Sequence, residues 1–356
     1  MSQNSASKLK PIWHGILRTI MVVVTTLVLV IVTLILLMLE IAHGPSDYAK
    51  RFFVCSVKET SAIGFLADWF YSDEEITKFI GLGRTNATNE TTDPTLVHVS
   101  TNPTDPTDED PAEPAEKNDL LPDEPLSIIE IKGSTYKGKL MAIRDPNRVF
   151  VGVCGEFSED KPGKTVLNMM SKYDAIAGTN GGGFKDTNGV GNGGMPIGIV
   201  ISQGKLCHGS KSATYQIIGF DNNNILHVGN MTGQQALDAG IRDAVSFGPM
   251  LIVNGKAMNE EAELSGGFNP RTAIGQTADG TVLLLVLEGR QASSIGATYD
   301  DLVSIFQKYG AVNAANLDGG SSSELNYNGE LITICSSLYG PRKMPSCILI
   351  KKEGNE

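Results

Sequence analysis

Four stretches of the sequence place charged or polar side chains close to glycines at the start or the end of an expected strand. In the last of them a mostly apolar run over residues 311–315 leads to Asp318, Gly319 and Gly320. Paired glycines let the backbone turn sharply and approach a ligand, and the Asp318 carboxylate lies close in sequence to hydroxyls such as that of Ser322. This stretch therefore predicts a binding or catalytic loop, although an ordinary Asp-Gly turn is the alternative for the stretch alone.

Two earlier stretches add an acid and two arginines. The apolar residues 281–287 end at Glu288, which is followed by a glycine and Arg290. A carboxylate at the end of a buried strand is held rigidly, so Glu288 can serve as an acid, a base or a metal ligand. Arg271 precedes a further expected strand, and its planar guanidinium suits a phosphate or a carboxylate. Simple ion pairing among these side chains is the competing interpretation.

The first of the four stretches is the glycine-rich loop over residues 178–184, which follows an expected strand at 174–177. Its backbone N–H groups, for instance those of Gly181 and Gly182, can face an anion, and Asn180 adds a side-chain amide. A glycine-rich hairpin without a function is the alternative. No G-x-x-x-x-G-K-S/T pattern follows, so the sequence does not support a nucleotide P-loop.

Several familiar chemistries are disfavoured. Residues 320–324 do not form the G-x-S-x-G nucleophile elbow, and only His208 and His227 fall in the globular part, which argues against a Ser-His-Asp hydrolase. The five cysteines are irregularly spaced, so no zinc site is predicted, and buried free thiols are the simplest expectation. No cofactor is required by the sequence. A divalent cation is compatible with the carboxylates, which are hard oxygen donors.

The elements that must position these residues are mostly strands. The runs rich in apolar residues and punctuated by glycine and asparagine turns predict strands at 197–202, 215–220, 250–253, 281–287 and 347–351. Three stretches are expected to be helical, namely 165–173, 234–245 and 299–309. Many strands with few helices predict an α+β (mixed α/β) fold: a single strand-rich catalytic domain over residues 126–352, behind a transmembrane helix and a disordered stalk.

The N-terminal part of the chain predicts a membrane anchor. Residues 20–39 contain no charge and are long enough to cross a hydrocarbon core. Lysine and arginine precede this segment and acids follow it, so residues 1–19 are expected in the cytoplasm and the rest of the chain outside. A cleaved signal peptide is the alternative, but the apolar run is long and lacks an A-x-A-like site. Residues 40–82 form an aromatic-rich juxtamembrane segment.

Residues 83–125 are expected to form an acidic, proline-rich linker. The part from residue 93 to 125 has ten acidic residues and one lysine among much proline. Such a segment buries little apolar surface and its charges repel, which predicts an extended, disordered stalk. With a net charge of −11, concentrated in this linker, the protein is not expected to bind nucleic acid.

The ordered set of motifs is far more specific than any one of them, and it resembles the phosphodiester glycosidase family. The family pattern is an N-G-G-F-F loop, a P-x-G strand entry, R-T-A-x-G, acid-G-R, N-L-D-G-G-G-S and a late R-x-x-P. The corresponding segments here are 180–184, 196–198, 271–275, 288–290, 316–322 and 342–345. This chain departs from the pattern in having an additional Gly183, Glu288 where Asp is usual, and Ser321 in place of a third glycine.

The resemblance implies one shared pocket and a hydrolase that breaks the bond between a sugar's anomeric carbon and a phosphodiester oxygen. The residues carried over to that pocket are Asn180, Gly181, Gly182, Arg271, Glu288, Arg290, Asn316, Asp318, Gly319, Gly320, Ser322 and Arg342. Asp318 is expected to be the nucleophile or base, and Glu288 the assisting acid or ligand. Arg271 and Arg342 are expected to stabilise the leaving phosphate.

The expected protein is thus a membrane-anchored extracytoplasmic glycosidase-type hydrolase acting on a sugar-phosphate polymer or glycoconjugate of the cell envelope. One alternative is a non-catalytic surface protein that binds a polysaccharide without turning it over. A second is a structural role in exopolysaccharide assembly, in which the stalk sets the reach from the membrane.

Overall fold

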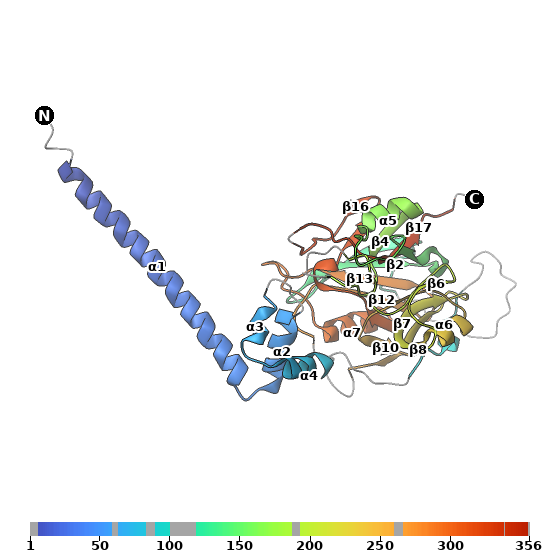
Figure 1. The fold of residues 1–356 in the computed structure, drawn as a ribbon. Helices are drawn as coiled ribbons and strands as arrows, with labels where there is room; N and C mark the ends of the chain where they lie inside the picture. The colour runs from blue at the N-terminus through green and yellow to red at the C-terminus, as the bar shows by residue number, and fades with distance from the viewer. Residues whose placement is uncertain are drawn as a thin grey trace. The chain divides into compact units, whose positions relative to one another are not determined.

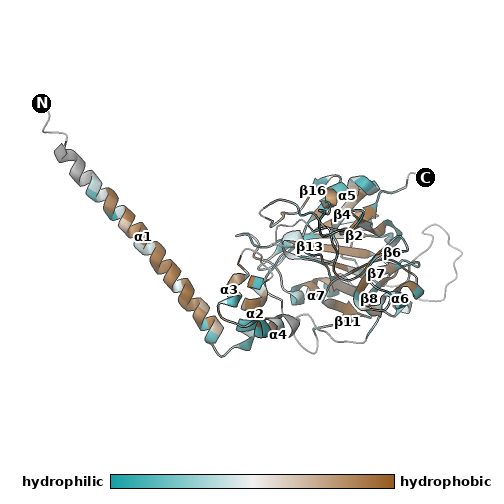
Figure 2. Cartoon of the chain, viewed as in Figure 1, coloured by the Kyte–Doolittle hydropathy of each residue, from teal (hydrophilic) through white to brown (hydrophobic). Residues whose placement is uncertain are grey.

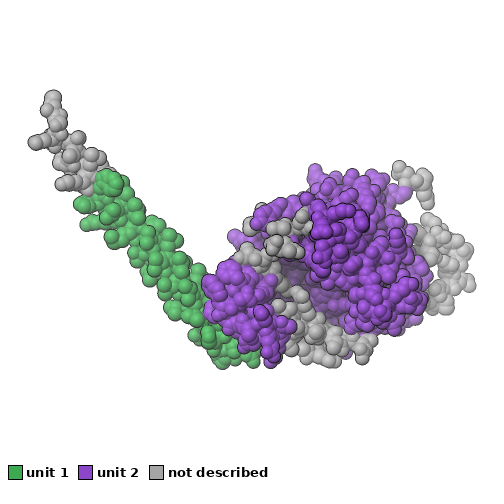
Figure 3. Space-filling model, viewed as in Figure 1, with its two compact units in different colours: residues 1–53 green, residues 54–356 purple. Residues whose placement is uncertain are grey.

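The computed structural model describes residues 6–58, 63–82, 90–99, 119–186, 193–259, 266–337 and 339–354. It divides into two compact units, residues 1–53 and 54–356, which are coloured separately in Figure 3. The strand-rich α+β fold expected from the sequence is confirmed, because sheets dominate everything after residue 125 (Figure 1).

The first unit is dominated by one apolar helix, α1 (Ala6–His43). Its segment Trp13–His43 is long and apolar enough to cross a membrane, judged by length and composition. Apolar residues cover most of its length in Figure 2, and the side chains described from residue 13 to 41 are largely exposed to solvent. Such a helix fits either a membrane anchor or a signal sequence.

Short helices follow, and the strands begin after residue 125. The helices that precede the first strand are α2 (Asp47–Lys58), α3 (Phe65–Asp68), α4 (Asp73–Leu82) and the 3-10 turn η1 (Pro94–Leu96). The later helices are α5 (Val166–Tyr173), α6 (Gly233–Asp238) and α7 (Tyr299–Lys308), with 3-10 turns η2 (Pro146–Arg148) and η4 (Gly320–Ser322). Threonine N-caps start all three of these α-helices, at Thr165, Thr232 and Thr298.

A seven-stranded antiparallel sheet forms the centre of the second unit. In spatial order its strands are β1 (Leu126–Lys132), β2 (Lys137–Ile143), β13 (Val282–Leu287), β12 (Arg271–Thr277), β14 (Ala311–Asn316), β10 (Met250–Val253) and β11 (Lys256–Ala257). In β13, Val282, Leu284 and Val286 face the central core, whereas the alternate leucines face the cluster that contains α7. Both faces are covered, which explains why this strand is apolar throughout.

Two five-stranded sheets complete the fold. One has the order β16 (Glu330–Leu331), β15 (Leu325–Tyr327), β4 (Ala175–Asn180), β17 (Ser346–Lys351), β3 (Val149–Val153). The other has the order β6 (Lys205–His208), β5 (Val200–Ser202), β9 (Ile241–Ser246), β7 (Thr214–Asp221), β8 (Leu226–Thr232). All three sheets contribute to one core, for example through Ile274, Ile348 and Ile218. Full burial of each such side chain contributes roughly 1.5–3 kcal/mol.

The structure differs from the sequence-based expectation at residues 234–245, which were expected to be one helix. The helix α6 ends at Asp238, and Gly240 adopts a left-handed φ of 72°. The chain then continues as β9, which pairs with β7 along its length. Val245 packs in the central core, whereas Ile241 and Ala244 pack in a second buried cluster, so both faces of β9 are covered and the segment lacks the one-sided pattern of a surface helix.

The two ends of the expected stalk also differ from the prediction, because both are bonded to the strand-rich domain. Near its start, the Thr92 hydroxyl accepts a bond from the Val228 N–H (2.9 Å), and the His98 N–H donates to the Ala278 carbonyl (2.8 Å). Near its end, the Leu121 carbonyl accepts a bond from the Arg144 guanidinium. Residues 90–99 and 119–125 are therefore packed on the strand-rich domain, while residues 100–118 of the expected stalk lie outside the described residues.

Candidate functional site

Three of the four predicted stretches meet at one end of the seven-stranded sheet. Arg271 at the start of β12 lies opposite Leu287 at the end of β13, and Asn316 at the end of β14 lies opposite Ala273. Because neighbouring strands are antiparallel, the start of β12 and the ends of its two neighbours, β13 and β14, lie at the same end of the sheet. The sheet thus brings the loops after residues 287 and 316 beside the loop before residue 271.

The glycine-rich loop after β4 joins this cluster through backbone bonds. The Asp318 N–H donates to the Gly181 carbonyl (3.1 Å), and the Asn180 side-chain amide donates to the Asp318 carbonyl. A further loop joins from the C-terminal side, where the Ser336 hydroxyl bonds to the Gly320 carbonyl (3.3 Å). All four stretches are therefore side by side.

Asn180 is a buried residue whose side chain forms hydrogen bonds to several of these loops. It is fully buried, and its side-chain oxygen accepts bonds from the hydroxyls of Thr272 (2.8 Å) and Thr179 (3.2 Å) and from the Glu324 N–H. Its amide nitrogen donates a hydrogen bond to the Asp318 carbonyl. The side chain that was predicted to bind substrate is thus engaged with protein groups and holds the loop that carries Asp318.

Asp318 begins the tight turn that the paired glycines predict. Gly320 has a left-handed φ of 62°, and its N–H donates to the Pro270 carbonyl (2.8 Å). A Cβ added at Gly319 would lie 3.1 Å from the same carbonyl oxygen. The turn is pinned at residues 318 and 320, so the half-buried Asp318 side chain projects from a rigid base.

Glu288 is held at the end of β13 by two partners. One carboxylate oxygen accepts the Ile334 N–H (2.9 Å), and the other lies 3.4 Å from the Lys137 ammonium. The side chain is 8% exposed. The carboxylate thus lies at the end of β13, beside a cation and the loop over residues 332–337.

Arg290 lies where it can reach both acid-bearing loops. Its guanidinium donates to the Ser321 hydroxyl (2.9 Å) and to the Asn269 side-chain oxygen (3.0 Å), and the side chain is half-buried. The backbone of Arg290 has a φ of 59°, a conformation that a non-glycine residue adopts rarely. Arg290 thus joins the loop that carries Glu288 to the loop that carries Asp318, and backbone conformations of this kind cluster at functional sites.

Arg271 lies deeper than its predicted role requires. It is 2% exposed, its guanidinium donates to the carbonyls of Ala297 (3.1 Å) and Gly267 (2.7 Å), and it stacks 4.0 Å from the centre of the Tyr299 ring. These contacts tie the loop before β12 to the start of α7. The geometry therefore supports a positioning role for Arg271 rather than direct contact with a phosphate.

The remaining predicted residues are divided between the surface and the interior. Arg342 is 12% exposed and forms an ion pair with Asp186 (2.8 Å). Asn316 is buried, and its amide donates to the Gly248 carbonyl (2.9 Å). Ser322 is also buried. Both polar side chains are therefore enclosed by protein at the ends of these loops.

Close packing leaves no room for a side chain at Gly181 or Gly182. A Cβ added at Gly181 would lie 2.9 Å from the carbonyl oxygen of Ser346, and one added at Gly182 would lie 2.8 Å from the carbonyl oxygen of Ser246. Both distances are too short for a real side chain. The glycines let the loop after β4 lie directly on its neighbours.

Sequence reasoning missed Glu324, which closes the predicted stretch but was assigned no role. It is 1% exposed, and burial raises its pKa to about 7, although the Val166 N–H and the Asn326 side chain lower it. One of its carboxylate oxygens has no hydrogen-bond partner, and neither does the buried Ser346 hydroxyl. Nothing in the sequence signals that this acid is turned inward, because burial depends on α5 packing beside it.

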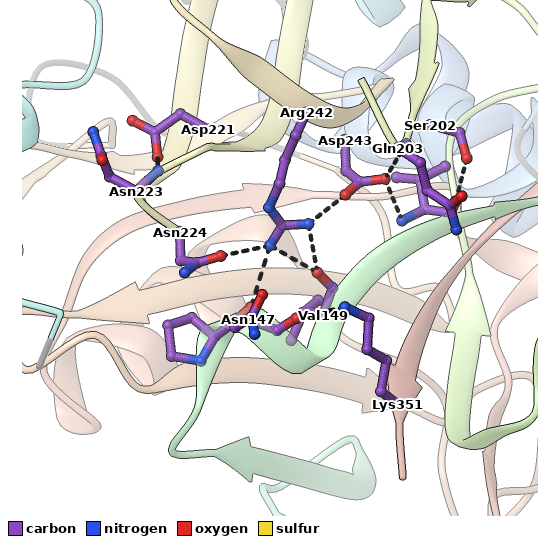
Figure 4. A network of polar contacts seen from close by, with 12 residues as sticks. Asn147, Val149, Ser202, Gln203, Asp221, Asn223, Asn224, Arg242, Asp243 and Lys351 are labelled. Atoms are coloured by element: carbon purple, nitrogen blue, oxygen red, sulfur yellow. Dashed lines mark hydrogen bonds and ion pairs between the residues drawn. The ribbon is translucent and has the colours of Figure 1, made fainter. Parts of the chain in front are cut away.

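A second polar network lies among residues outside the predicted site (Figure 4). The Asp243 carboxylate pairs with Arg242 and accepts the N–H groups of Val151 (3.1 Å) and Gln203 (3.0 Å). Arg242 also donates to the Val149 carbonyl (3.1 Å). These bonds, together with one from Arg242 to the Asn224 side-chain oxygen (2.9 Å), join β9 to β3, to the end of β5 and to the turn between β7 and β8.

Among the residues that the structure describes, no group of three or more His, Cys, Asp or Glu side chains is arranged to hold a metal ion. The five cysteines are all free thiols.

A known protein family matches the part of the chain that contains these loops. The family model described as phosphodiester glycosidase matches residues 173–351, which contain all four stretches. The chain belongs to the phosphodiester glycosidase family. Homologues in this family are glycosidase-type hydrolases, and the resemblance seen in the sequence is confirmed.

Individual relatives of the chain are distant. The chain is 29% identical over 178 residues to the SPbeta prophage-derived uncharacterized protein YomE of Bacillus subtilis, covering 48% of this chain and 27% of that one. It is 24% identical over 228 residues to mouse N-acetylglucosamine-1-phosphodiester alpha-N-acetylglucosaminidase, covering 57% of this chain and 42% of that one. The matches thus span less than half the length of either relative.

A solved structure supports the fold. The zebrafish N-acetylglucosamine-1-phosphodiester alpha-N-acetylglucosaminidase catalytic domain, auto-inhibited by its pro-peptide, superposes with a TM-score of 0.54 at 22% identity. The superposition covers 67% of this chain and 87% of the zebrafish chain. At this identity the likeness establishes the phosphodiester glycosidase fold alone.

Proposed function

We propose that the protein is a membrane-anchored extracytoplasmic hydrolase that cleaves the glycosidic bond of a sugar-1-phosphodiester in a polysaccharide or glycoconjugate of the cell envelope. The observation that carries the proposal is the pinned turn that holds Asp318 next to the loop bearing Glu288 and Arg290. Two carboxylates and a guanidinium on rigid loops are the groups that such a reaction needs.

In the proposed reaction the bond between the anomeric carbon and the phosphodiester oxygen breaks. Its electron pair leaves with the phosphate, which becomes a monoester, and a water-derived hydroxyl ends on the sugar. Asp318 acts as the nucleophile or as the base that takes the water proton, and Glu288 assists as an acid or ligand. Phosphate is a good leaving group, so charge stabilisation matters more than proton donation.

The stabilising cations in this proposal are Arg290 and Arg342. Arg290 is half-buried and bonded to the Ser321 hydroxyl on the Asp318 loop. Arg342 lies beside Asp186, which follows the glycine-rich loop. A bidentate guanidinium is well suited to a phosphate. Arg271, whose bonds go to backbone carbonyls, is assigned to positioning instead.

The anchor and the location are part of the same proposal. The segment Trp13–His43 can cross a membrane by length and composition, and the basic residues before it favour a cytoplasmic N-terminus. The strand-rich unit then lies outside the membrane, with a carbohydrate or sugar-phosphate substrate as its partner. No cofactor is assigned, and a divalent cation bound by Asp318 and Glu288 is an outcome that chelation tests.

Turnover tests the proposal directly. The full chain in lipid nanodiscs is incubated with UDP-N-acetylglucosamine and with purified envelope polymers, and released reducing sugar is measured with and without exhaustive chelation. Release of sugar together with a new phosphomonoester supports the reaction. Binding of the polymer without release would instead favour a polysaccharide-binding surface protein.

A further inference from the structure

The hairpin that joins β1 to β2 borders the loop that carries Glu288. The Glu288 N–H donates to the Lys137 carbonyl (2.8 Å), and the Gly296 N–H donates to the Thr135 carbonyl (3.0 Å). The family model matches residues 173–351, so this hairpin lies outside the matched part of the chain. It nevertheless contacts both ends of a loop of the candidate site.

Lys137 and Glu288 lie opposite each other on adjacent antiparallel strands. In the register of β2 and β13, Gly138 pairs with Leu287, so the residues just beyond them, Lys137 and Glu288, face each other. A Cβ added at Gly138 would overlap the Val286 carbonyl oxygen, so glycine allows the two strands to approach here. Side chains directly opposite each other in an antiparallel pair interact. The sheet therefore places the Lys137 ammonium beside the Glu288 carboxylate.

The Lys137 ammonium is the charged partner of a buried carboxylate. It lies 3.4 Å from one Glu288 carboxylate oxygen, and the Ile334 N–H donates to the other (2.9 Å). Among the described residues the first oxygen accepts no hydrogen bond, so the ammonium is the group that compensates its charge. The Glu288 side chain is 8% exposed, and a buried charge is costly unless it is paired.

Ser294 joins the same two residues through their backbones. Its hydroxyl accepts a bond from the Lys137 N–H (3.1 Å) and donates to the Glu288 carbonyl (2.7 Å). Ser294 is itself buried. Lys137 is thus fixed to Glu288 by its side chain, by its carbonyl and, through Ser294, by its N–H.

A second lysine on the same strand forms an ordinary surface ion pair. Lys139 lies two residues further along β2, on the same face of the strand, and pairs with Glu130. The Glu130 side chain is 77% exposed, and an ion pair of this kind contributes little to stability. Of the two acids, Glu288 is the one that is buried and that lies in the candidate site.

We propose that Lys137 is a positioning residue of the site, which holds the Glu288 carboxylate in place for the reaction. The proposal deepens the proposed function, and its kinetic part rests on that function. Lys137 acts through Glu288 and Ser294 and does not contact the substrate. A carboxylate that loses its cation can turn towards other donors or solvent, and a displacement of about 1 Å can cost about 10²-fold in rate.

The kinetic test is a double-mutant cycle on the full chain in nanodiscs, with the methyl ester of N-acetylglucosamine-1-phosphate as the probe. Lys137→Met is expected to lower kcat by roughly 10- to 100-fold with KM within about twofold, because a group that acts in the transition state is misplaced. In the Glu288→Gln background the same substitution should change kcat by less than about twofold, since no carboxylate is left to position.

Two further variants control for charge and for folding. Lys137→Arg keeps a cation beside Glu288 and should retain kcat within about threefold, whereas Lys137→Gln repeats the test with a polar, uncharged head. Lys139→Met removes a lysine from the same face of β2 and should leave kcat unchanged in both backgrounds. A merely structural effect of Lys137→Met would lower kcat equally in both backgrounds, which would overturn the inference.

Hydrogen exchange decides the inference if the parent chain does not hydrolyse the probe and the proposed function fails. Because the Ile334 N–H is bonded to the Glu288 carboxylate, Lys137→Met should make amide exchange in residues 332–337 about 10-fold faster. Lys139→Met should leave it at the parent rate. Exchange that Lys137→Met and Lys137→Gln both leave unchanged would show that the ammonium does not hold the carboxylate.

Discussion

The Asn180 side-chain amide donates a hydrogen bond to the backbone carbonyl of Asp318, although the two residues are 138 positions apart in the chain. The bond joins the end of β4, in one sheet, to the turn that follows β14 in another. The backbone at Asp318 is therefore held by a fully buried amide as well as by the turn. The site is assembled at the junction of two sheets that share a core.

Replacing Asp318 by Asn tests the central chemical assignment. The amide keeps the size of the side chain but can neither act as a nucleophile nor take a proton, so release of sugar should fall by roughly 10²–10⁴-fold. The free energy of unfolding should change little, because the turn is pinned by backbone groups. Asp238→Asn, at an exposed position on α6, is the control for an aspartate outside the site. Sugar release by Asp318→Asn at the parent rate would exclude the assignment.

Substitution of Arg271 should lower mainly the stability of the protein, whereas substitution of Arg290 should lower mainly its turnover. Arg271→Lys removes bonds to two backbone carbonyls and the stacking on Tyr299, which should cost about 1–3 kcal/mol of unfolding free energy. Arg290→Lys should lower kcat/KM by roughly 10²-fold with a smaller change in stability, since its proposed role is at the phosphate. Urea unfolding and steady-state kinetics on both variants distinguish the roles. The reverse pattern would return the phosphate contact to Arg271.

The contrast between these arginines shows what the sequence can and cannot predict. Local patterns predicted that polar residues follow apolar strands, and the antiparallel register then brought those strand ends together. A continuous apolar run also predicted β13, and apolar residues on one side of a helix predicted α7, both correctly. The sequence did not indicate how deeply each side chain is buried. Arg271 is buried because carbonyls from residues 267 and 297 surround it, and no local pattern distinguishes it from the half-buried Arg290.

The same limit applies to residues that break a pattern. The segment at 234–245 has helical composition over its first turns, but Gly240 and pairing with β7 turn its second half into β9. The acidic linker has the composition of a disordered chain, yet Thr92 and Leu121 near its ends are buried against the domain. In both cases tertiary contacts outweigh local preference.

Glu324 should make stability depend on pH in a direction opposite to that of a salt-bridged acid. Its pKa is raised from 4.5 in a model peptide to about 7 by burial, so between these values the folded state holds a proton that the unfolded state has lost. Stability from this group is complete below about pH 4.5 and falls by about 3 kcal/mol as the pH rises to 7. Glu324→Gln cannot ionise and should lack that decline.

Denaturant unfolding of Glu324→Gln and the parent protein across pH 4.5–8 measures the difference, which should favour the variant increasingly towards pH 7. Glu330→Gln, at an exposed position in β16, should follow the parent curve. A constant offset between Glu324→Gln and the parent over this range would show that the carboxyl does not titrate there.

The Arg242 and Asp243 pair should matter for stability and not for chemistry. Asp243 is 1% exposed, and truncation to Ala removes the carboxylate partner of Arg242 and leaves the Val151 and Gln203 N–H groups without their acceptor. Breaking a buried ion pair by removing one partner costs about 3–5 kcal/mol. Asp243→Asn can still accept both N–H bonds and should cost less. Because no residue of this network belongs to the proposed site (Figure 4), kcat/KM of both variants should match the parent wherever they remain folded. A selective loss of turnover at unchanged stability would place this network in the reaction after all.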